Sequence, residues 1–167
     1  PYIQRLRGKT VIIKYGGNAM IDDELTLTIL QDIALLKSVG VNPIIVHGGG
    51  PDINLMLERL DIQSQFIDGL RVTDEKSMEV VQMVLAGKLN KDIVSSPPLW
   101  GVKCIGRCGK DAALLEVEKK PRRNGADLGF VGKIVSVNTK LLMTLSQDEY
   151  IPVIAPVGVD AQGQSYN

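Results

Sequence analysis

The sequence is poor in the residues on which most catalytic and metal sites depend. Its 167 residues include one histidine and two cysteines. The cysteines, Cys104 and Cys108, are spaced C-x3-C without a second pair, which fits neither a zinc ribbon nor a disulfide framework. No serine or cysteine in a nucleophile motif stands near His47 in the sequence. We therefore expect two reduced, structural thiols and assign no metal ligands.

The sequence also lacks a net charge and any long apolar run. Nineteen Lys and Arg residues balance nineteen Asp and Glu residues, so no overall field draws the chain to nucleic acid or to an anionic membrane. The basic run at 119–123 has no interleaved aromatics and adjoins a turn, which favours a solvated loop. Neither a bilayer span nor a signal peptide is recognisable. We expect a cytoplasmic protein that binds a small molecule, with a plastid location open if a transit peptide has been removed.

What the sequence does contain is enough apolar material for one domain. Apolar residues make up 44% of the chain, which suffices for a core. A β-rich run at 10–14 precedes an amphipathic stripe at 22–39, and a second run at 41–46 precedes a helix at 50–60. Because strands and helices alternate, the sequence predicts a parallel sheet with right-handed crossovers, an α/β fold.

The second half of the chain continues with mixed elements. Residues 73–75 open a third helix, which must end before Pro97-Pro98 because neither proline donates a backbone hydrogen bond. The remaining expected elements are a strand at 102–105, a hairpin of 114–117 with 131–137, a short helix at 138–145 and a strand at 151–155.

Two glycine turns follow the first two predicted strands. The run at 41–46 leads into His47-Gly48-Gly49-Gly50-Pro51, and the run at 10–14 leads into Gly16-Gly17 with Lys14 at its carboxyl end. Glycines let the backbone approach a ligand, and the helix after Pro51 aims its N–H groups and dipole there. Since parallel strands present functional groups at their carboxyl ends, this pattern predicts phosphate binding. An ordinary strand-to-helix turn fits the pattern alone equally well, and no Walker or Rossmann fingerprint is complete.

A single arginine stands in the turn before the third helix. In Gly69-Leu70-Arg71-Val72-Thr73-Asp74, Arg71 could hold a carboxylate through two parallel N–H bonds. The plainer alternative is a surface arginine that pairs with Asp68 or Asp74. His47 is interpreted as a packed, hydrogen-bonded histidine.

Taken together, the motifs resemble the acetylglutamate kinases of the amino acid kinase family. The similarity covers essentially the whole chain, in order and at matching spacing. The segments that carry it are Lys14-Tyr15-Gly16-Gly17-Asn18-Ala19-Met20, Val46-His47-Gly48-Gly49-Gly50-Pro51, Asp68-Gly69-Leu70-Arg71-Val72-Thr73, Leu89-Asn90-Lys91, Gly109-Lys110-Asp111, Leu128-Gly129-Phe130-Val131-Gly132, Ser136-Val137-Asn138-Thr139 and Ile151-Pro152-Val153-Ile154-Ala155-Pro156.

The resemblance implies a fold and a set of site residues. The fold would be a three-layer αβα sandwich with a mainly parallel sheet plus a β-hairpin. Residues 1–167 would form its N-terminal, N-acetyl-L-glutamate-binding domain, and the C-terminal ATP-binding domain would be absent from this chain. By correspondence, the catalytic lysine is Lys14, the acceptor-binding residues are Gly49, Gly50, Arg71 and Asn167, and the residues that face the ATP phosphates are Gly16 and Gly17.

The resemblance also implies an activity and partners. The enzyme would use ATP and Mg2+ to phosphorylate the γ-carboxylate of N-acetyl-L-glutamate in arginine biosynthesis. The isolated chain would be inactive, because the family's catalytic aspartate and second lysine lie past Asn167, itself expected to be frayed at the chain end. A homo-oligomer, dimer or hexamer, and a PII signalling protein are the partners it suggests. Alternatives are a non-catalytic ligand-binding or oligomerisation module and another amino acid kinase.

Overall fold

The computed structural model describes residues 2–121 and 125–167. Part of the predicted basic loop, Arg122 and Arg123 with the adjoining Asn124, lies outside the described residues. The first half of the chain contains α1 (Tyr2–Leu6), β1 (Thr10–Tyr15), a 3-10 turn (Gly17–Met20), α2 (Asp23–Ser38), β2 (Asn42–His47), α3 (Gly50–Arg59), β3 (Gln65–Ile67), β4 (Leu70–Val72) and α4 (Glu75–Gln82).

The second half begins within the same long helix. It contains a π-helix (Met83–Leu89), α5 (Asn90–Val94), a 3-10 turn (Pro97–Leu99), β5 (Lys103–Cys108), a 3-10 turn (Asp111–Ala113), β6 (Leu115–Lys119), β7 (Gly132–Val137), α6 (Thr139–Gln147), β8 (Tyr150–Ala155), β9 (Gly158–Val159) and β10 (Ser165–Tyr166).

A four-stranded parallel sheet forms the centre of the molecule, in the order β1-β2-β8-β5. Five of the six residues of β8 are buried, as expected for a strand covered on both faces. β1 lies at the edge, and alternate residues of it are exposed. The parallel sheet predicted from the strand–helix alternation is therefore confirmed.

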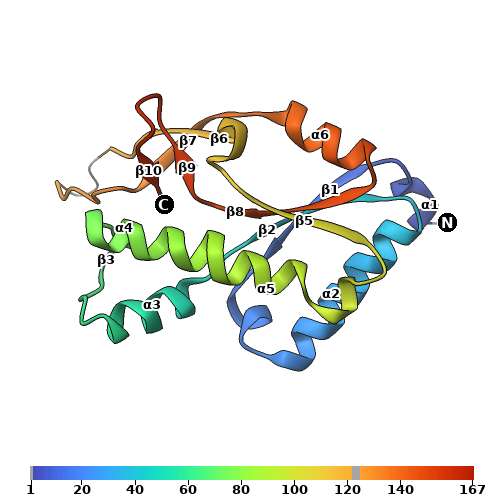
Figure 1. Cartoon of the computed structure of the whole chain (residues 1–167), viewed down its shortest axis with the longest axis horizontal. Helices are drawn as coiled ribbons and strands as arrows, with labels where there is room; N and C mark the ends of the chain where they lie inside the picture. Colours follow the sequence, from blue (N-terminus) through green and yellow to red (C-terminus); the bar gives the residue numbers. More distant parts are fainter. Residues whose placement is uncertain (1, 122–124) are drawn as a thin grey trace.

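Helices cover both faces of this sheet, which gives three layers (Figure 1). Helices α2, α3, α4 and α5 lie on one face, and α6 lies on the other. Tyr15, Ile45 and Val153 pack into the cluster on the α2 and α5 side. Ile44 and Ile154, the alternate residues of β2 and β8, pack toward Leu141 and Leu142 of α6. The predicted αβα sandwich is confirmed.

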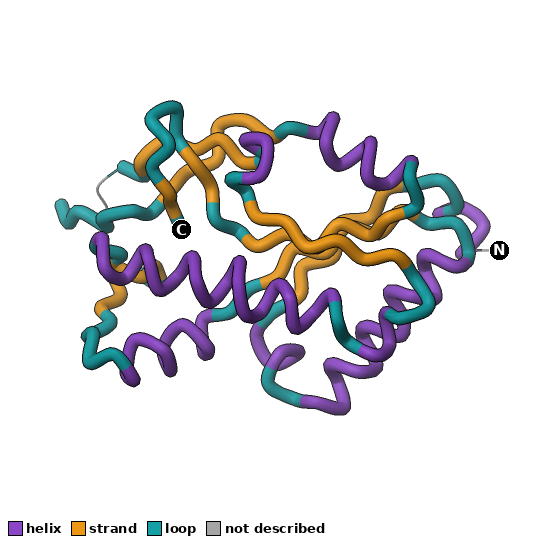
Figure 2. The backbone as a smooth tube through the Cα atoms, in the orientation of Figure 1, coloured by secondary structure: helices purple, strands orange, loops and turns teal. Residues whose placement is uncertain are grey.

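A second, smaller sheet stands beside the central one, near the C-terminus (Figure 2). Its order is β10-β9-β6-β7, with β6 and β7 paired antiparallel as the predicted hairpin. Residues Asp22, Asp74 and Asn138 cap α2, α4 and α6 through hydrogen bonds from backbone N–H groups three residues later. These caps explain why the helices begin where the sequence indicates.

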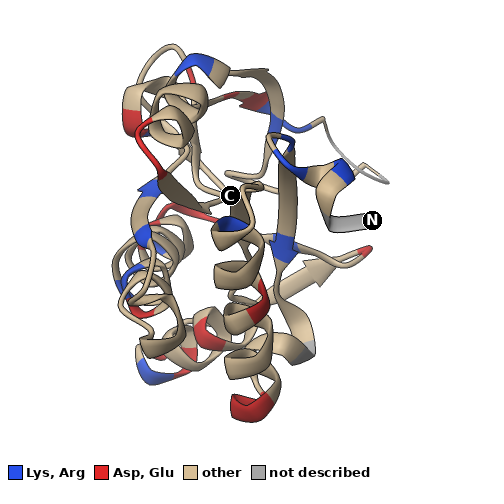
Figure 3. Cartoon of the chain, turned by 90° about the vertical axis from the view of Figure 1, so that its right-hand side faces the viewer, with Lys and Arg blue, Asp and Glu red and all other residues tan. Residues whose placement is uncertain are grey.

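Two features expected from the composition, cysteines without a disulfide and a surface of mixed charge, are seen in the structure. Cys104 and Cys108 are free in the structure and half-buried. Both signs of charge are scattered over the side shown in Figure 3. Within the described ranges, no helix has the length and apolar character needed to cross a membrane.

Candidate functional site

The pairing of β1 with β2 brings the two glycine turns together. Lys14 lies opposite Val46, and Tyr15 lies opposite His47. Beyond the strands, the Gly48 N–H donates to the Tyr15 carbonyl at 2.8 Å. A Cβ built on Gly16 would lie 3.6 Å from the Gly48 nitrogen. Lys14 and both turns therefore lie together at the carboxyl ends of β1 and β2, as their positions after the two strands predicted.

The triple-glycine turn leads directly into α3. Gly49 is the N-cap, and Gly50 is the first helical residue. A Cβ on Gly49 would lie 2.3 Å from Leu89 Cδ1 and 2.6 Å from Leu85 Cδ2, whereas a Cβ on Gly50 would meet open space. The first turn of the helix leaves N–H groups without intrahelical partners. The turn is thus closed by leucines on one side and open above Gly50.

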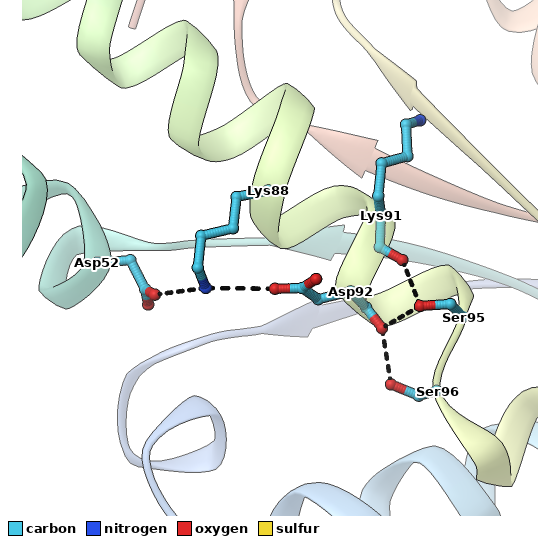
Figure 4. Close-up of polar contacts among 6 residues, drawn as sticks. All are labelled: Asp52, Lys88, Lys91, Asp92, Ser95 and Ser96. Atoms are coloured by element: carbon cyan, nitrogen blue, oxygen red, sulfur yellow. Dashed lines mark hydrogen bonds and ion pairs between the residues drawn. The ribbon is translucent and has the colours of Figure 1, made fainter.

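A lysine ties this turn to the long helix opposite. Lys88 Nζ lies 3.1 Å from Asp52 Oδ1, in the first turn of α3, and 3.2 Å from Asp92 Oδ2 (Figure 4). The hydrogen bond to Asp52, followed by that to Asp92, raises the pKa of Lys88 against the opposing effect of partial burial. Because the ammonium is half exposed, the contribution to stability is small. The contact joins the first turn of α3 to the long helix at Lys88.

The predicted acceptor arginine is buried, with 7% of its surface exposed. Arg71 donates through Nη2 to Asn54 Oδ1 at 2.7 Å and through Nη1 to Ser64 Oγ. Its guanidinium carbon lies 4.7 Å from the centre of the Phe66 ring, and burial lowers the pKa of Arg71. The alternative of a surface arginine paired with Asp68 or Asp74 is wrong, because Arg71 is covered by α3 and the loop before β3.

Asn167 is connected to Arg71 through one buried threonine. Thr73 Oγ1 donates to the Arg71 carbonyl at 3.1 Å and accepts from Asn167 Nδ2 at 3.5 Å. The Asn167 backbone donates to Phe130 at 2.9 Å and accepts from Gly132 at 3.0 Å. The expectation of a frayed Asn167 is therefore wrong, because backbone pairing next to β7 holds it.

His47 is a packed histidine, as predicted. It is 1% exposed, with Nδ1 2.8 Å from the Gly48 carbonyl and Nε2 3.2 Å from Asn90 Nδ2. These contacts fit a neutral ring in which Nδ1 donates and Nε2 accepts. Burial lowers the pKa of His47, and the hydrogen bond to Gly48 partly opposes this. The buried His47 ring therefore supports the glycine turn through its hydrogen bond to the Gly48 carbonyl.

Sequence reasoning missed the residues that support Arg71 and Asn167. Asn54 and Ser64 belong to no motif of the chemistry considered, and Thr73, although it stands in the motif around Arg71, was assigned no role. The available signal was the spacing of Asn54, which stands one helical turn after Gly50 and so shares its face.

Two cavities of the structure differ in size, and the one beside these residues is the smaller. One of about 280 Å³ is lined by Asn54 and other residues of α3 and by the loop that follows it, up to Ser64. A larger one, of about 550 Å³, lies between β1, β2 and α6 and contains none of the predicted site residues. The smaller cavity adjoins the two hydrogen-bond partners of Arg71, Asn54 and Ser64. Across the described part of the chain, no group of three or more His, Cys, Asp or Glu side chains could hold a metal ion.

Known proteins share both the sequence and the fold. A family model described as the amino acid kinase family matches residues 9–167. Proteins named acetylglutamate kinase from Caldicellulosiruptor saccharolyticus and Heliobacterium modesticaldum are 58% and 51% identical over this whole chain. The chain covers 58% and 59% of them, so it spans about three fifths of the length of these relatives.

A solved structure shows the same fold. The N-acetylglutamate synthase from Neisseria gonorrhoeae, complexed with coenzyme A and N-acetyl-glutamate, matches the whole of this chain with a TM-score of 0.83. The match covers 38% of that protein at 24% sequence identity.

Proposed function

The chain belongs to the amino acid kinase family, and from this premise we propose that it is the acceptor-binding part of an acetylglutamate kinase. The reaction would transfer the γ-phosphoryl group of ATP to the γ-carboxylate of N-acetyl-L-glutamate. The relatives that share about half or more of its residues carry that name. Because the chain spans only part of their length, we propose that the ATP-binding domain lies in the remaining part.

One observation supports phosphoryl transfer as the class of reaction. β1 and β2 pair in register, so Lys14 and two glycine turns lie at the same edge of the sheet. Lysine and backbone N–H groups are what a transferred phosphoryl group requires, because its oxygens carry the charge of the transition state. The identity of the acceptor is supported separately, by the names of the relatives.

The acceptor explains the scarcity of catalytic side chains. A carboxylate is already anionic at neutral pH, so no general base is needed to activate it. What the protein must supply is alignment of two anions. In this proposal Arg71, Asn167, Gly49 and Gly50 hold the acceptor, and Lys14 acts on the transferred phosphoryl group.

Residues for the nucleotide are present only in part. Gly17 has a φ of +63°, and a Cβ there would meet open space, so the turn at Gly16-Gly17 can approach phosphate oxygens. ATP bound there would supply the phosphoryl group, and a divalent metal, Mg2+ in our proposal, would neutralise part of its charge. We assign the metal to the remaining part of the protein, since the described residues offer no cluster of ligands.

The test is an assay of ADP release with ATP, Mg2+ and N-acetyl-L-glutamate, on the complete protein and on the 167-residue chain. We expect turnover that depends on the acceptor in the complete protein and none in the chain alone. Turnover with another amino acid only would indicate a different amino acid kinase. Binding without turnover by the complete protein would indicate a non-catalytic module. Association into dimers or hexamers and binding of a PII protein stay predictions, which light scattering with and without PII would check.

A further inference from the structure

The guanidinium of Arg71 is held by uncharged groups. Nη1 donates to the Ser64 hydroxyl and Nη2 donates to the Asn54 amide oxygen at 2.7 Å. The third contact is the face of the Phe66 ring, 4.7 Å away. A buried arginine is usually found with a carboxylate, because an unpaired charge is costly to bury. Around Arg71, the Asn54 amide, the Ser64 hydroxyl and the Phe66 ring stand where a carboxylate would be expected.

Acidic side chains occur in the same region but do not neutralise this arginine. Among the described residues, 2–121 and 125–167, the ion pairs of the structure do not include Arg71. Asp52, two residues before Asn54, is paired with Lys88 at 3.1 Å. Asp74, three residues after Arg71, accepts from the Ser77 N–H at 2.8 Å and caps α4. The positive charge of Arg71 is therefore oriented without being cancelled.

Donors of the guanidinium also remain for a ligand. Arginine carries five N–H donors in a rigid fork. Ser64 and Asn54 each accept one of them. Within the described residues the other three have no side-chain acceptor, and this number is enough for a carboxylate held by two parallel bonds.

We propose that Asn54 and Ser64 are positioning residues, which fix the Arg71 guanidinium through neutral oxygens so that its charge stays available to the carboxylate of the acceptor. This inference rests on the proposed function, because it takes N-acetyl-L-glutamate as the anion. Neutrality is the essential property. A carboxylate at position 54 would also accept the hydrogen bond, but it would pair with the guanidinium and compete with the acceptor.

The test is therefore Asn54→Asp, which keeps the size and the accepting oxygen and adds one negative charge. Calorimetric titration of the complete protein with N-acetyl-L-glutamate should show an affinity lower by about tenfold or more, since one competing charge pair of 1.4 kcal/mol corresponds to a factor of ten. The melting temperature should not fall, because the arginine keeps a hydrogen-bond partner, which now carries the opposite charge.

Two further variants separate this role from a structural one. Asn54→Leu removes the acceptor, and we expect a lower melting temperature with an affinity loss smaller than that of Asn54→Asp. Asn42→Asp adds the same charge at the start of β2, away from the glycine turn, and should leave affinity unchanged.

Each outcome then has a definite meaning. Wild-type affinity in Asn54→Asp, or an affinity higher than in Asn54→Leu, would overturn the inference while leaving the proposed function intact. Equal losses in Asn54→Asp and Asn42→Asp would reduce the effect to net charge and overturn it too. An absence of acceptor binding by the wild-type protein would instead refute the proposed function, and this inference with it.

Discussion

The contact between Gly49 and the long helix makes a sharp prediction about stability. In Gly49→Ala the new methyl group would lie 2.3 Å from Leu89 Cδ1 and 2.6 Å from Leu85 Cδ2. Both leucines are nearly fully buried, with 6% and 2% of their surfaces exposed. Their ends are enclosed by other atoms of the core, so either these side chains or the helix must shift to admit the methyl group.

The size of the effect follows from packing. Forcing an extra carbon into a filled core costs roughly 1–3 kcal/mol. In a chain of this size each kcal/mol lowers the melting temperature by about 2–4 °C, so the expected decrease is roughly 2–12 °C.

Gly50→Ala is the matched control one residue later. Its methyl group would meet open space, and alanine is favoured over glycine in a helix by up to about 1 kcal/mol. Urea unfolding of both variants and the wild type should show a clear loss for Gly49→Ala and none for Gly50→Ala. Equal stability of the two variants would refute the close packing of the glycine turn against Leu85 and Leu89.

Three other residues give direct tests. Arg71→Ala should weaken acceptor binding about ten- to a hundredfold by removing a charge-assisted contact, and unchanged affinity by calorimetry would remove it from the site. Lys14→Met in the complete protein should lower turnover about a hundredfold or more with little change in the acceptor KM; steady-state kinetics that show the opposite would assign Lys14 to acceptor binding. Because burial lowers the pKa of His47 from 6.5, the unfolded chain takes up a proton below that pH before the folded one does, and stability falls. Unfolding from pH 7.5 to 5.5 should show a fall steeper in the wild type than in His47→Gln, by up to about 1.4 kcal/mol per pH unit, and parallel falls would exclude that role.

The strands, the main helices and their starting points could be predicted because local signals specify them. Asp22, Asp74 and Asn138 provide caps, and all three are observed. The apolar run at β8 predicted a buried strand. The glycines after β1 and β2 predicted two turns at the carboxyl ends of neighbouring strands.

The remaining features depend on contacts between distant segments. The π-helix at Met83–Leu89 has no marked sequence signal, and it faces Gly49 through Leu85 and Leu89. β9 and β10 are two residues each, too short for a periodic pattern. Asn54 and Ser64 could not be assigned to Arg71 because their proximity depends on how α3 packs beside β4.

The central claim is that the triple-glycine turn, Arg71 and Asn167 form one acceptor site. The most direct measurement is a titration of the isotopically labelled 167-residue chain with N-acetyl-L-glutamate, followed by amide chemical shifts. The account predicts that the amides of 48–50, 71–73 and 167 shift together and saturate with a single dissociation constant. Shifts confined to one of these segments, or no shifts at concentrations that saturate the complete protein, would contradict it.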